Sequence, residues 1–164
     1  MAKRAGAYVL ATVSTEDKAA LAREAGADSA IIYTREDFEE EVKKGTDGRG
    51  CQAVYDSVGQ TTFEKSLNCL ARRGCLALYG QSSGPVPPVA TGSLRASSYL
   101  TRPGLVDHTA TREELEWRAG EVFSWVASGE LKVRVGGEFP LAEAAEAHCQ
   151  LEGRHSTGKL LLIP

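Results

Sequence analysis

Long apolar runs, paired cysteine motifs and an excess of basic charge are all absent from this sequence of 164 residues. No stretch approaches the ~18 consecutive apolar residues that a membrane-spanning helix needs, so we expect no membrane association. The net charge of −3 gives no basic surface for nucleic acid, so we expect no nucleic-acid partner. The four cysteines have no CxxC spacing, and the three histidines form no zinc-site pattern with them. We therefore expect reduced thiols, no metal site and a cytoplasmic location.

A glycine-rich phosphate-binding turn is also missing. Glycine is plentiful, with 17 residues, yet no G-x-G-x-x-G motif follows an apolar strand anywhere in the chain. The single methionine is the first residue, and residues 1–7 look like the last turn of a helix that ends in a glycine. No helix precedes that turn. The chain is therefore expected to begin inside a structural element, as a truncation or an internal start would.

Short apolar runs alternate with amphipathic segments along about the first hundred residues. Buried strands are predicted at residues 9–13, 29–33, 53–55 and 75–79, with a further strand at residues 98–101. Helices are predicted after Ser14 or Thr15 as the N-cap and up to Gly26, at residues 35–44, and around Phe63, Leu67 and Leu70 up to Gly74. This alternation with short connections predicts a parallel, doubly wound sheet.

The pattern changes in the last third of the chain. Residues 111–128 form the longest predicted helix, with an apolar stripe that includes Leu115, Val122 and Phe123. A half-exposed strand is then predicted at residues 132–135, a helix at residues 141–151 and a terminal strand at residues 159–164. We expect a boundary between structural units near residues 105–130.

The strand–helix unit at residues 9–27 carries a chemical signal where its strand ends. In a Rossmann fold, an acid at the tip of the second strand binds the adenosine ribose, and enzymes for the 2′-phosphorylated cofactor replace it with neutral and basic groups. Here Ser14 and Lys18 would attract a phosphate that a carboxylate ~4 Å away would repel. As a second Rossmann strand, this unit would prefer NADP(H) over NAD(H). The alternative is that Lys18 is an ordinary solvated lysine.

Several segments, in this order and spacing, carry a resemblance to a known family. They are TVSTEDKAALAREAGAD at residues 12–28, VYDSVG at 54–59, SLNCLARRGCLALYGQSSGPVPP at 66–88, LTRP at 100–103, TATREEL at 109–115, and PLAEAAEAH followed by LEGRHSTGKLLLIP within 140–164. Over nearly its whole length the chain resembles the nucleotide-binding half and C-terminal end of the quinone oxidoreductase (zeta-crystallin-like) branch of the zinc-independent medium-chain dehydrogenase/reductases.

The resemblance implies an α/β fold: an incomplete Rossmann-type doubly wound parallel sheet that lacks its first strand and its glycine-rich turn. Residues 1–108 would form the partial NADP(H)-binding domain, and residues 109–129 a connecting helix. Residues 130–164 would be a strand–helix–strand segment of the absent GroES-like catalytic domain.

The resemblance also implies NADPH as the cofactor and assigns its contacts. Ser14 and Lys18 match the 2′-phosphate site, and Tyr33 matches a residue along the adenosine phosphate side. Val58 lies in the loop beyond the strand VYDS, Tyr79 and Ser82 border the nicotinamide half, and Arg154 matches a basic residue that reaches the cofactor from the C-terminal segment. Without the resemblance, Tyr33 and Tyr79 could equally be core tyrosines with wet hydroxyls, and Arg154 a surface charge.

The activity that the resemblance implies is metal-independent hydride transfer from NADPH to a quinone or an enone. We assign no catalytic residue, because the substrate-side groups would come from the missing domain. One alternative is a zinc-free enoyl reductase of the same superfamily, and another is a truncated, non-catalytic interaction module. A homodimer or higher self-association is expected, because several strand edges would be left unpaired.

Overall fold

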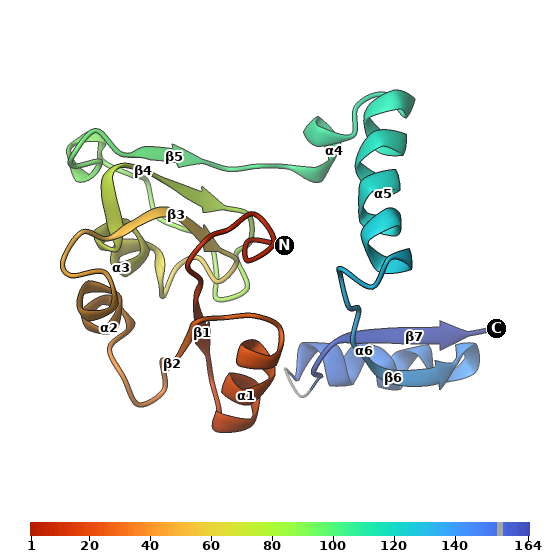
Figure 1. The fold of residues 1–164 in the computed structure, drawn as a ribbon. Coiled ribbons are helices and arrows are strands. Elements are labelled where there is room, and N and C mark those ends of the chain that lie inside the picture. Colours follow the sequence, from red (N-terminus) through yellow and green to blue (C-terminus); the bar gives the residue numbers. More distant parts are fainter. Residues whose placement is uncertain (154–155) are drawn as a thin grey trace. The chain divides into compact units, whose positions relative to one another are not determined.

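The computed structural model describes residues 1–153 and 156–164, and these form two compact units. One unit comprises Ala2–Leu115, and the other comprises Glu116–Pro164 together with Met1. The first contains β1 (Leu10–Val13), α1 (Glu16–Glu24), β2 (Ser29–Ile32), α2 (Phe38–Gly45), β3 (Cys51–Asp56), α3 (Phe63–Asn68), β4 (Leu70–Leu78), the 3-10 turn η1 (Thr91–Ser93), β5 (Tyr99–Thr101) and α4 (Leu105–His108) (Figure 1). Helix α5 (Arg112–Ala127) contains the division, and β6 (Val135–Pro140), η2 (Leu141–Glu143), α6 (Ala144–Glu152) and β7 (Lys159–Ile163) follow it.

The strands of the first unit form two sheets, and all of their described pairings are parallel. Strand β1 pairs with β2, and β3, β4 and β5 follow one another in the second sheet. In the Rossmann order 3-2-1-4-5-6, these strands correspond to positions 3-2 and 4-5-6, so the break between β1 and β3 coincides with the absent first strand. The predicted incomplete, parallel α/β fold is confirmed.

Helix α1 begins and ends at residues that its sequence marks clearly. The Thr15 hydroxyl accepts a hydrogen bond from the Lys18 N–H at 3.3 Å, so Thr15 rather than Ser14 is the N-cap. Gly26 has φ +100°, which satisfies the left-handed position after the helix that glycine occupies most readily. The first unit therefore opens with the predicted strand–helix pair.

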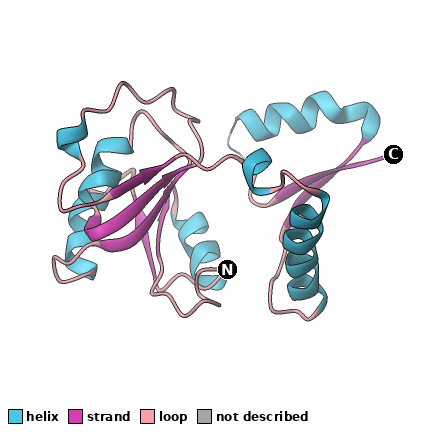
Figure 2. Ribbon diagram, turned by 90° about the horizontal axis from the view of Figure 1, so that it is seen from above, coloured by secondary structure: helices cyan, strands magenta, loops and turns pink. Residues whose placement is uncertain are grey.

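Helices cover both faces of β2, as a doubly wound sheet requires. Ala30 and Ile32 pack on one face against Ala19 of α1. Ile31 points to the other face, where it packs with Val42 of α2 and with Cys69, beside α3. Figure 2 shows helices on both sides of the strands in this unit. The alternation of side chains along one short strand thus joins two separate hydrophobic clusters.

A third cluster lies between α3 and β4. Leu76, which is fully buried, and Leu78 pack against Phe63 of α3, with Leu67 and Leu70 at the margin. The prediction that Leu70 continues the helix is wrong, because α3 ends at Asn68 and Leu70 opens β4. The Cys51 N–H donates to the Cys69 carbonyl at 2.8 Å, and this pairing with β3 ends the helix before Leu70.

The second unit differs from its predicted outline in two respects. Its first strand, β6, begins only at Val135, whereas the alternating residues 132–135 predicted it earlier. Helix α5 forms as predicted, but it has no buried residue, and Phe123 of its apolar stripe is 70% exposed. Strand β6 pairs in parallel with β7, and α6 buries Ala147. In the described ranges, no helix combines the length and apolar character needed to cross a membrane.

Candidate functional site

The carboxyl ends of β1 and β2 bring three of the predicted cofactor residues together. The Tyr33 N–H donates to the Val13 carbonyl at 3.0 Å, which extends the strand pairing to its last residue. One residue further on, the Thr34 hydroxyl donates to the Ser14 carbonyl at 2.9 Å. Lys18 lies half-buried in the first turn of α1, and Tyr33 is 46% exposed. Ser14, Lys18 and Tyr33 therefore lie around one end of this two-stranded sheet.

This end of the sheet carries both acids and cations, because α1 opens with Glu16 and Asp17. The Glu16 carboxylate forms ion pairs with Arg35 at 2.9 Å and with Arg23 at 3.7 Å. These guanidinium groups offset its charge. Lys18 adds a further cation one helical turn beyond Ser14, and the Ser14 and Thr34 hydroxyls add neutral polar groups. This set of donors fits a phosphate group.

The carboxyl ends of β3 and β4 bring a second group together. The loop after β3 carries Val58, and the loop after β4 carries Tyr79 and Ser82. The Ser82 N–H donates to the Ser57 carbonyl at 3.2 Å, and the Ser83 N–H donates to the Val58 carbonyl at 2.8 Å. The Tyr79 side chain is 57% exposed, so it does not serve as a core residue.

Two residues that sequence reasoning missed hold these loops. The Asp56 carboxylate, 4% exposed, accepts hydrogen bonds from the Val58 N–H at 2.8 Å and the Gly59 N–H at 3.1 Å. The Ser83 hydroxyl donates to the Val58 carbonyl at 2.7 Å and accepts from the Thr61 N–H at 3.1 Å. The one available signal was an acid directly after an apolar strand, at the edge where parallel α/β folds bind ligands.

Glycine allows the two loops to approach each other closely. A Cβ atom on Gly80 would lie 2.5 Å from the Ser57 carbonyl oxygen, and one on Gly59 would lie 2.9 Å from the Gly84 carbonyl oxygen. Gly59 also has φ +88°, a conformation that L side chains rarely adopt. The loops after β3 and β4 are thus locked together by backbone contacts, and no larger residue fits at these positions.

The predicted site residues therefore form two groups, one on each sheet of the first unit. The hydrogen bonds described above join the chain segments that carry each group: the ends of β1 and β2 for the first, and the loops after β3 and β4 for the second. Arg154, the remaining predicted contact, lies outside the described residues. Within residues 1–153 and 156–164, no three His, Cys, Asp or Glu side chains are arranged to hold a metal ion.

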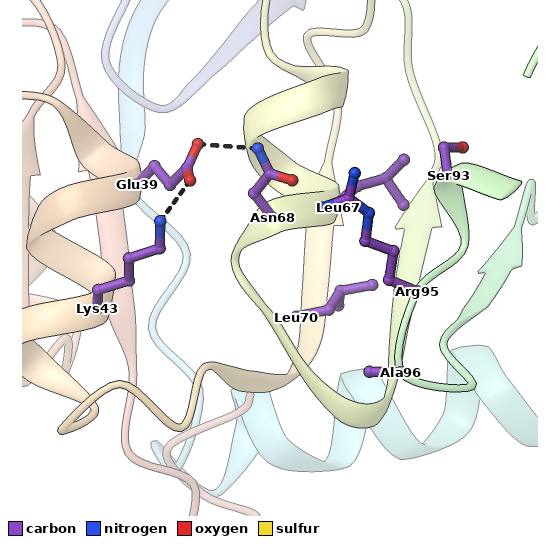
Figure 3. Close-up of a pocket in the computed structure, with 8 residues that line it drawn as sticks. All are labelled: Glu39, Lys43, Leu67, Asn68, Leu70, Ser93, Arg95 and Ala96. Carbon is purple, nitrogen blue, oxygen red and sulfur yellow. Dashed lines mark hydrogen bonds and ion pairs between the residues drawn. The ribbon is translucent and has the colours of Figure 1, made fainter.

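A separate pocket of about 330 Å³ lies at the other end of the strands (Figure 3). It is lined by Glu39, Lys43, Leu67, Asn68, Leu70, Ser93, Arg95 and Ala96. Leu70 opens β4, and Arg95 and Ala96 precede β5, so the pocket faces the amino ends of these strands. Glu39 accepts from Lys43 at 2.6 Å and from Asn68 at 3.1 Å. No predicted cofactor residue lines this pocket.

Parallel strands with helices packed on both faces define an α/β unit of the Rossmann type. The chain belongs to the zinc-binding dehydrogenase family, whose model matches residues 25–162. The class and the family thus agree, and the quinone oxidoreductase resemblance of the sequence segments is confirmed by the relatives that follow.

Three relatives illustrate the match. The chain is 46% identical to quinone oxidoreductase 1 of Escherichia coli and 42% identical to 2-haloacrylate reductase of a Burkholderia species. Each alignment covers 99% of this chain. The crystal structure of E. coli quinone oxidoreductase complexed with NADPH superimposes with a TM-score of 0.92 at 44% identity, again over 99% of this chain. The chain spans about half of each relative: 51% and 50% of the two sequences, and 51% of the crystallised protein.

Proposed function

We propose that this chain is the NADPH-binding half of an oxidoreductase that delivers hydride to a quinone or another electron-poor double bond. The observation that carries the proposal is the pair of residue groups at the carboxyl ends of β1–β2 and β3–β4. A homologue of the same fold has been crystallised with NADPH, which supports NADPH as the cofactor. When bound, NADPH supplies the hydride.

The chain's own residues divide the work of holding this cofactor. Lys18 and Ser14, beside the ion-paired Glu16, would bind the 2′-phosphate, and Tyr33 would lie along the adenosine side. The interlocked loops that carry Val58, Tyr79 and Ser82 would border the nicotinamide half. Such a site contributes chiefly orientation and exclusion of water. No residue of this chain is assigned to the proton or acceptor chemistry, which stays with groups outside it.

Two acceptor classes remain within the proposal. The quinone oxidoreductase relative favours a quinone, and the 2-haloacrylate reductase relative favours an activated carbon–carbon double bond. A zinc-free enoyl reductase belongs to the second class. In all of these cases the protein works without metal, and residues 1–108 serve as the partial cofactor domain, residues 109–129 as a connecting helix and residues 130–164 as part of a catalytic domain.

Self-association and a cytoplasmic location belong to the same proposal. The β1 and β3 edges that flank the break between the two sheets favour a homodimer or a larger assembly. The four cysteines are all free thiols, which agrees with a reducing compartment. A non-catalytic interaction module is the competing function, because the chain lacks the glycine-rich turn that binds pyrophosphate.

Calorimetric titration of the chain with NADPH and with NADH separates these functions. We expect binding weaker than about 1 μM, because backbone amides at a glycine-rich helix N-terminus supply much of the affinity for dinucleotides. NADPH should still bind more tightly than NADH. A quinone-reduction assay and a 2-haloacrylate-reduction assay on the same preparation then report on the acceptor.

Each result has a definite reading. Preference for NADPH supports the proposed cofactor site, and equal affinity for the two cofactors contradicts the role of Lys18 and Ser14. No binding of either cofactor at millimolar concentration would favour the non-catalytic module. Submicromolar binding would contradict the expected effect of the missing turn.

A further inference from the structure

The Asp56 carboxylate is the most heavily bonded side chain of the site. Its Oδ1 atom accepts from the Val58 and Gly59 N–H groups, and the Thr62 hydroxyl lies 3.0 Å from Oδ1 and 2.8 Å from Oδ2. The Ser66 hydroxyl donates to Oδ2 at 2.8 Å. All of these donors are neutral. A buried carboxylate without a cationic partner is costly unless several such donors satisfy it, so its environment is built around it.

The main chain of Asp56 holds the neighbouring loop as well. Its carbonyl oxygen accepts from the Tyr79 N–H at 2.9 Å and from the Gly80 N–H at 3.4 Å. The side chain thus fixes the start of the loop after β3, and the backbone of the same residue fixes the start of the loop after β4. Val58 then accepts from Ser83, which ties the two loops together. One residue therefore determines how both loops leave the sheet.

These contacts stay within one half of the site. Every hydrogen bond of the Asp56 carboxylate goes to the loop after β3 or to α3. The hydrogen bonds at the ends of β1 and β2 run from the Tyr33 N–H to Val13 and from the Thr34 hydroxyl to Ser14, on the other sheet. Loss of the carboxylate should therefore loosen the loop that carries Val58 directly. It should reach the loop that carries Tyr79 only through the Ser83–Val58 hydrogen bonds, and leave Ser14 and Lys18 in place.

We propose that Asp56 is a positioning residue for the nicotinamide half of the cofactor, acting through the loops after β3 and β4. The inference rests on the proposed function, because it assumes that these loops border the nicotinamide. The inference assigns different residues to the two halves of the cofactor. The buried carboxylate controls the orientation of the nicotinamide ring and has no influence on recognition of the 2′-phosphate.

Two ligands that sample different parts of the site test this division. NADPH spans both halves, and adenosine 2′,5′-bisphosphate occupies the adenosine half alone. Titrations of the full 164-residue chain compare Asp56→Ala and Asp56→Asn with the unsubstituted protein. Ser66→Ala is the matched control, because it also removes a buried hydrogen bond to the same carboxylate but leaves the N–H groups of Val58 and Gly59 bound.

We expect Asp56→Ala to weaken NADPH about tenfold, equivalent to about 1.4 kcal/mol, and to change adenosine 2′,5′-bisphosphate less than about twofold. Asp56→Asn keeps an acceptor for the two N–H groups and should lie between Asp56→Ala and the unsubstituted chain. Ser66→Ala should match the unsubstituted chain for both ligands. Saturation-transfer NMR should show weaker transfer to the nicotinamide protons of NADPH in Asp56→Asn, with transfer to the adenine protons unchanged.

Several outcomes would overturn the inference. Equal weakening of both ligands would make Asp56 a general structural residue, and unchanged NADPH binding would remove its role altogether. If Asp56→Ala does not fold, Asp56→Asn decides through the ratio of nicotinamide to adenine saturation transfer. Failure of the proposed function looks different, because the unsubstituted chain would then bind adenosine 2′,5′-bisphosphate no better than adenosine 5′-monophosphate.

Discussion

Replacing Gly80 by alanine should disrupt the junction between the loops after β3 and β4. The new Cβ would lie 2.5 Å from the Ser57 carbonyl oxygen and 2.9 Å from the Ser57 Cα. Carbon atoms in good contact are about 3.5–4.0 Å from their neighbours, so an overlap of about 1 Å must be relieved. Both partners are backbone atoms, so relief requires movement of a loop rather than a side-chain rotation.

The cost follows from the contacts that such a movement sacrifices. Overpacking alone typically destabilises a protein by about 1–3 kcal/mol. Separation of the loops also strains the hydrogen bond from the Ser82 N–H to Ser57, worth about 0.5–1.5 kcal/mol. We therefore expect Gly80→Ala to lower the free energy of unfolding by about 2–4 kcal/mol, or to shift a urea midpoint by about 1–2 M.

Gly92→Ala is the matched control for this experiment. A Cβ at Gly92 would meet no atom within 4 Å, and its φ lies outside the left-handed region. Its urea midpoint should equal or slightly exceed that of the unsubstituted chain. Both variants are compared by circular dichroism in urea at one fixed protein concentration, because self-association couples stability to concentration. Equal midpoints for the two variants would refute the steric reasoning.

Four further predictions concern charge, thiol reactivity and assembly. Lys18→Ala should weaken NADPH by about 1–3 kcal/mol and leave NADH unaffected in calorimetry, whereas an unchanged NADPH affinity would make Lys18 a surface lysine. A hydrogen bond from Lys65, at 2.6 Å, lowers the pKa of Asp37 below its ordinary 3.8. The interaction therefore stabilises the folded state above pH 3.8, and this stabilisation is lost as the pH falls through the lower pKa of the folded state. Between about pH 5 and pH 2, the free energy of unfolding of Lys65→Gln should therefore fall less than that of the unsubstituted chain. Urea unfolding at several pH values measures this, and an equal fall in both proteins would contradict it. Burial raises the pKa of the Cys69 thiol to about 12, so iodoacetamide at about pH 8 should alkylate it far more slowly than the exposed Cys149, as peptide mass spectrometry can show. One edge of β1 and one edge of β3 have no partner strand among the described residues, and these edges should drive self-association. A single 17.5 kDa species with a cooperative melt in light scattering and calorimetry would argue against this.

The alternation of strands and helices could be predicted because burial leaves a periodic trace in the sequence. The strand at β2 was visible as a short apolar run, and its two-sided burial by α1 and α2 explains why it lacks polar alternation. Helix α1 was visible through its hydroxyl cap and Gly26. The spacing of Phe63, Leu67 and Leu70 also fits a helix, but Leu70 pairs with β3 and belongs to a strand. The spacing of neighbouring residues does not show that a distant strand will pair with one of them.

The bounds of strand β6 were predicted too early for a similar reason. Its pairing with β7 includes Gly137 and shifts register at Gly136, and glycine seldom suggests a strand. A Cβ at Gly136 would lie 2.4 Å from the Thr157 carbonyl oxygen, so the close approach of a distant segment explains the glycine. The pattern of residues 132–135 contains no information about the position of that segment, so it could not predict where the strand begins.

The candidate site was partly predictable. Ser14 and Lys18 follow an apolar strand, so their place at its carboxyl end could be inferred from position alone. Asp56 holds the same kind of position, yet its importance depends on donors up to ten residues away, and on a main-chain carbonyl that binds the following loop. Hydrogen-bond networks of this kind depend on loop conformation, which residue types do not specify.

The parallel pairing of every described strand has a consequence for how the chain acquires its structure. Leu10 pairs with Ser29, Cys75 with Tyr99 and Val135 with Lys159, so no described pair can be made by a local hairpin. Each sheet contact must await closure of an intervening segment, which contains a helix or, between β4 and β5, the 3-10 turn η1, and the entropy of that closure precedes any gain from strand pairing. During synthesis, the earlier strand of each pair therefore emerges before its partner. It stays exposed for a time that depends on the length of the intervening segment. Refolding should accordingly be slower than for a helical bundle of this length, with aggregation competing throughout.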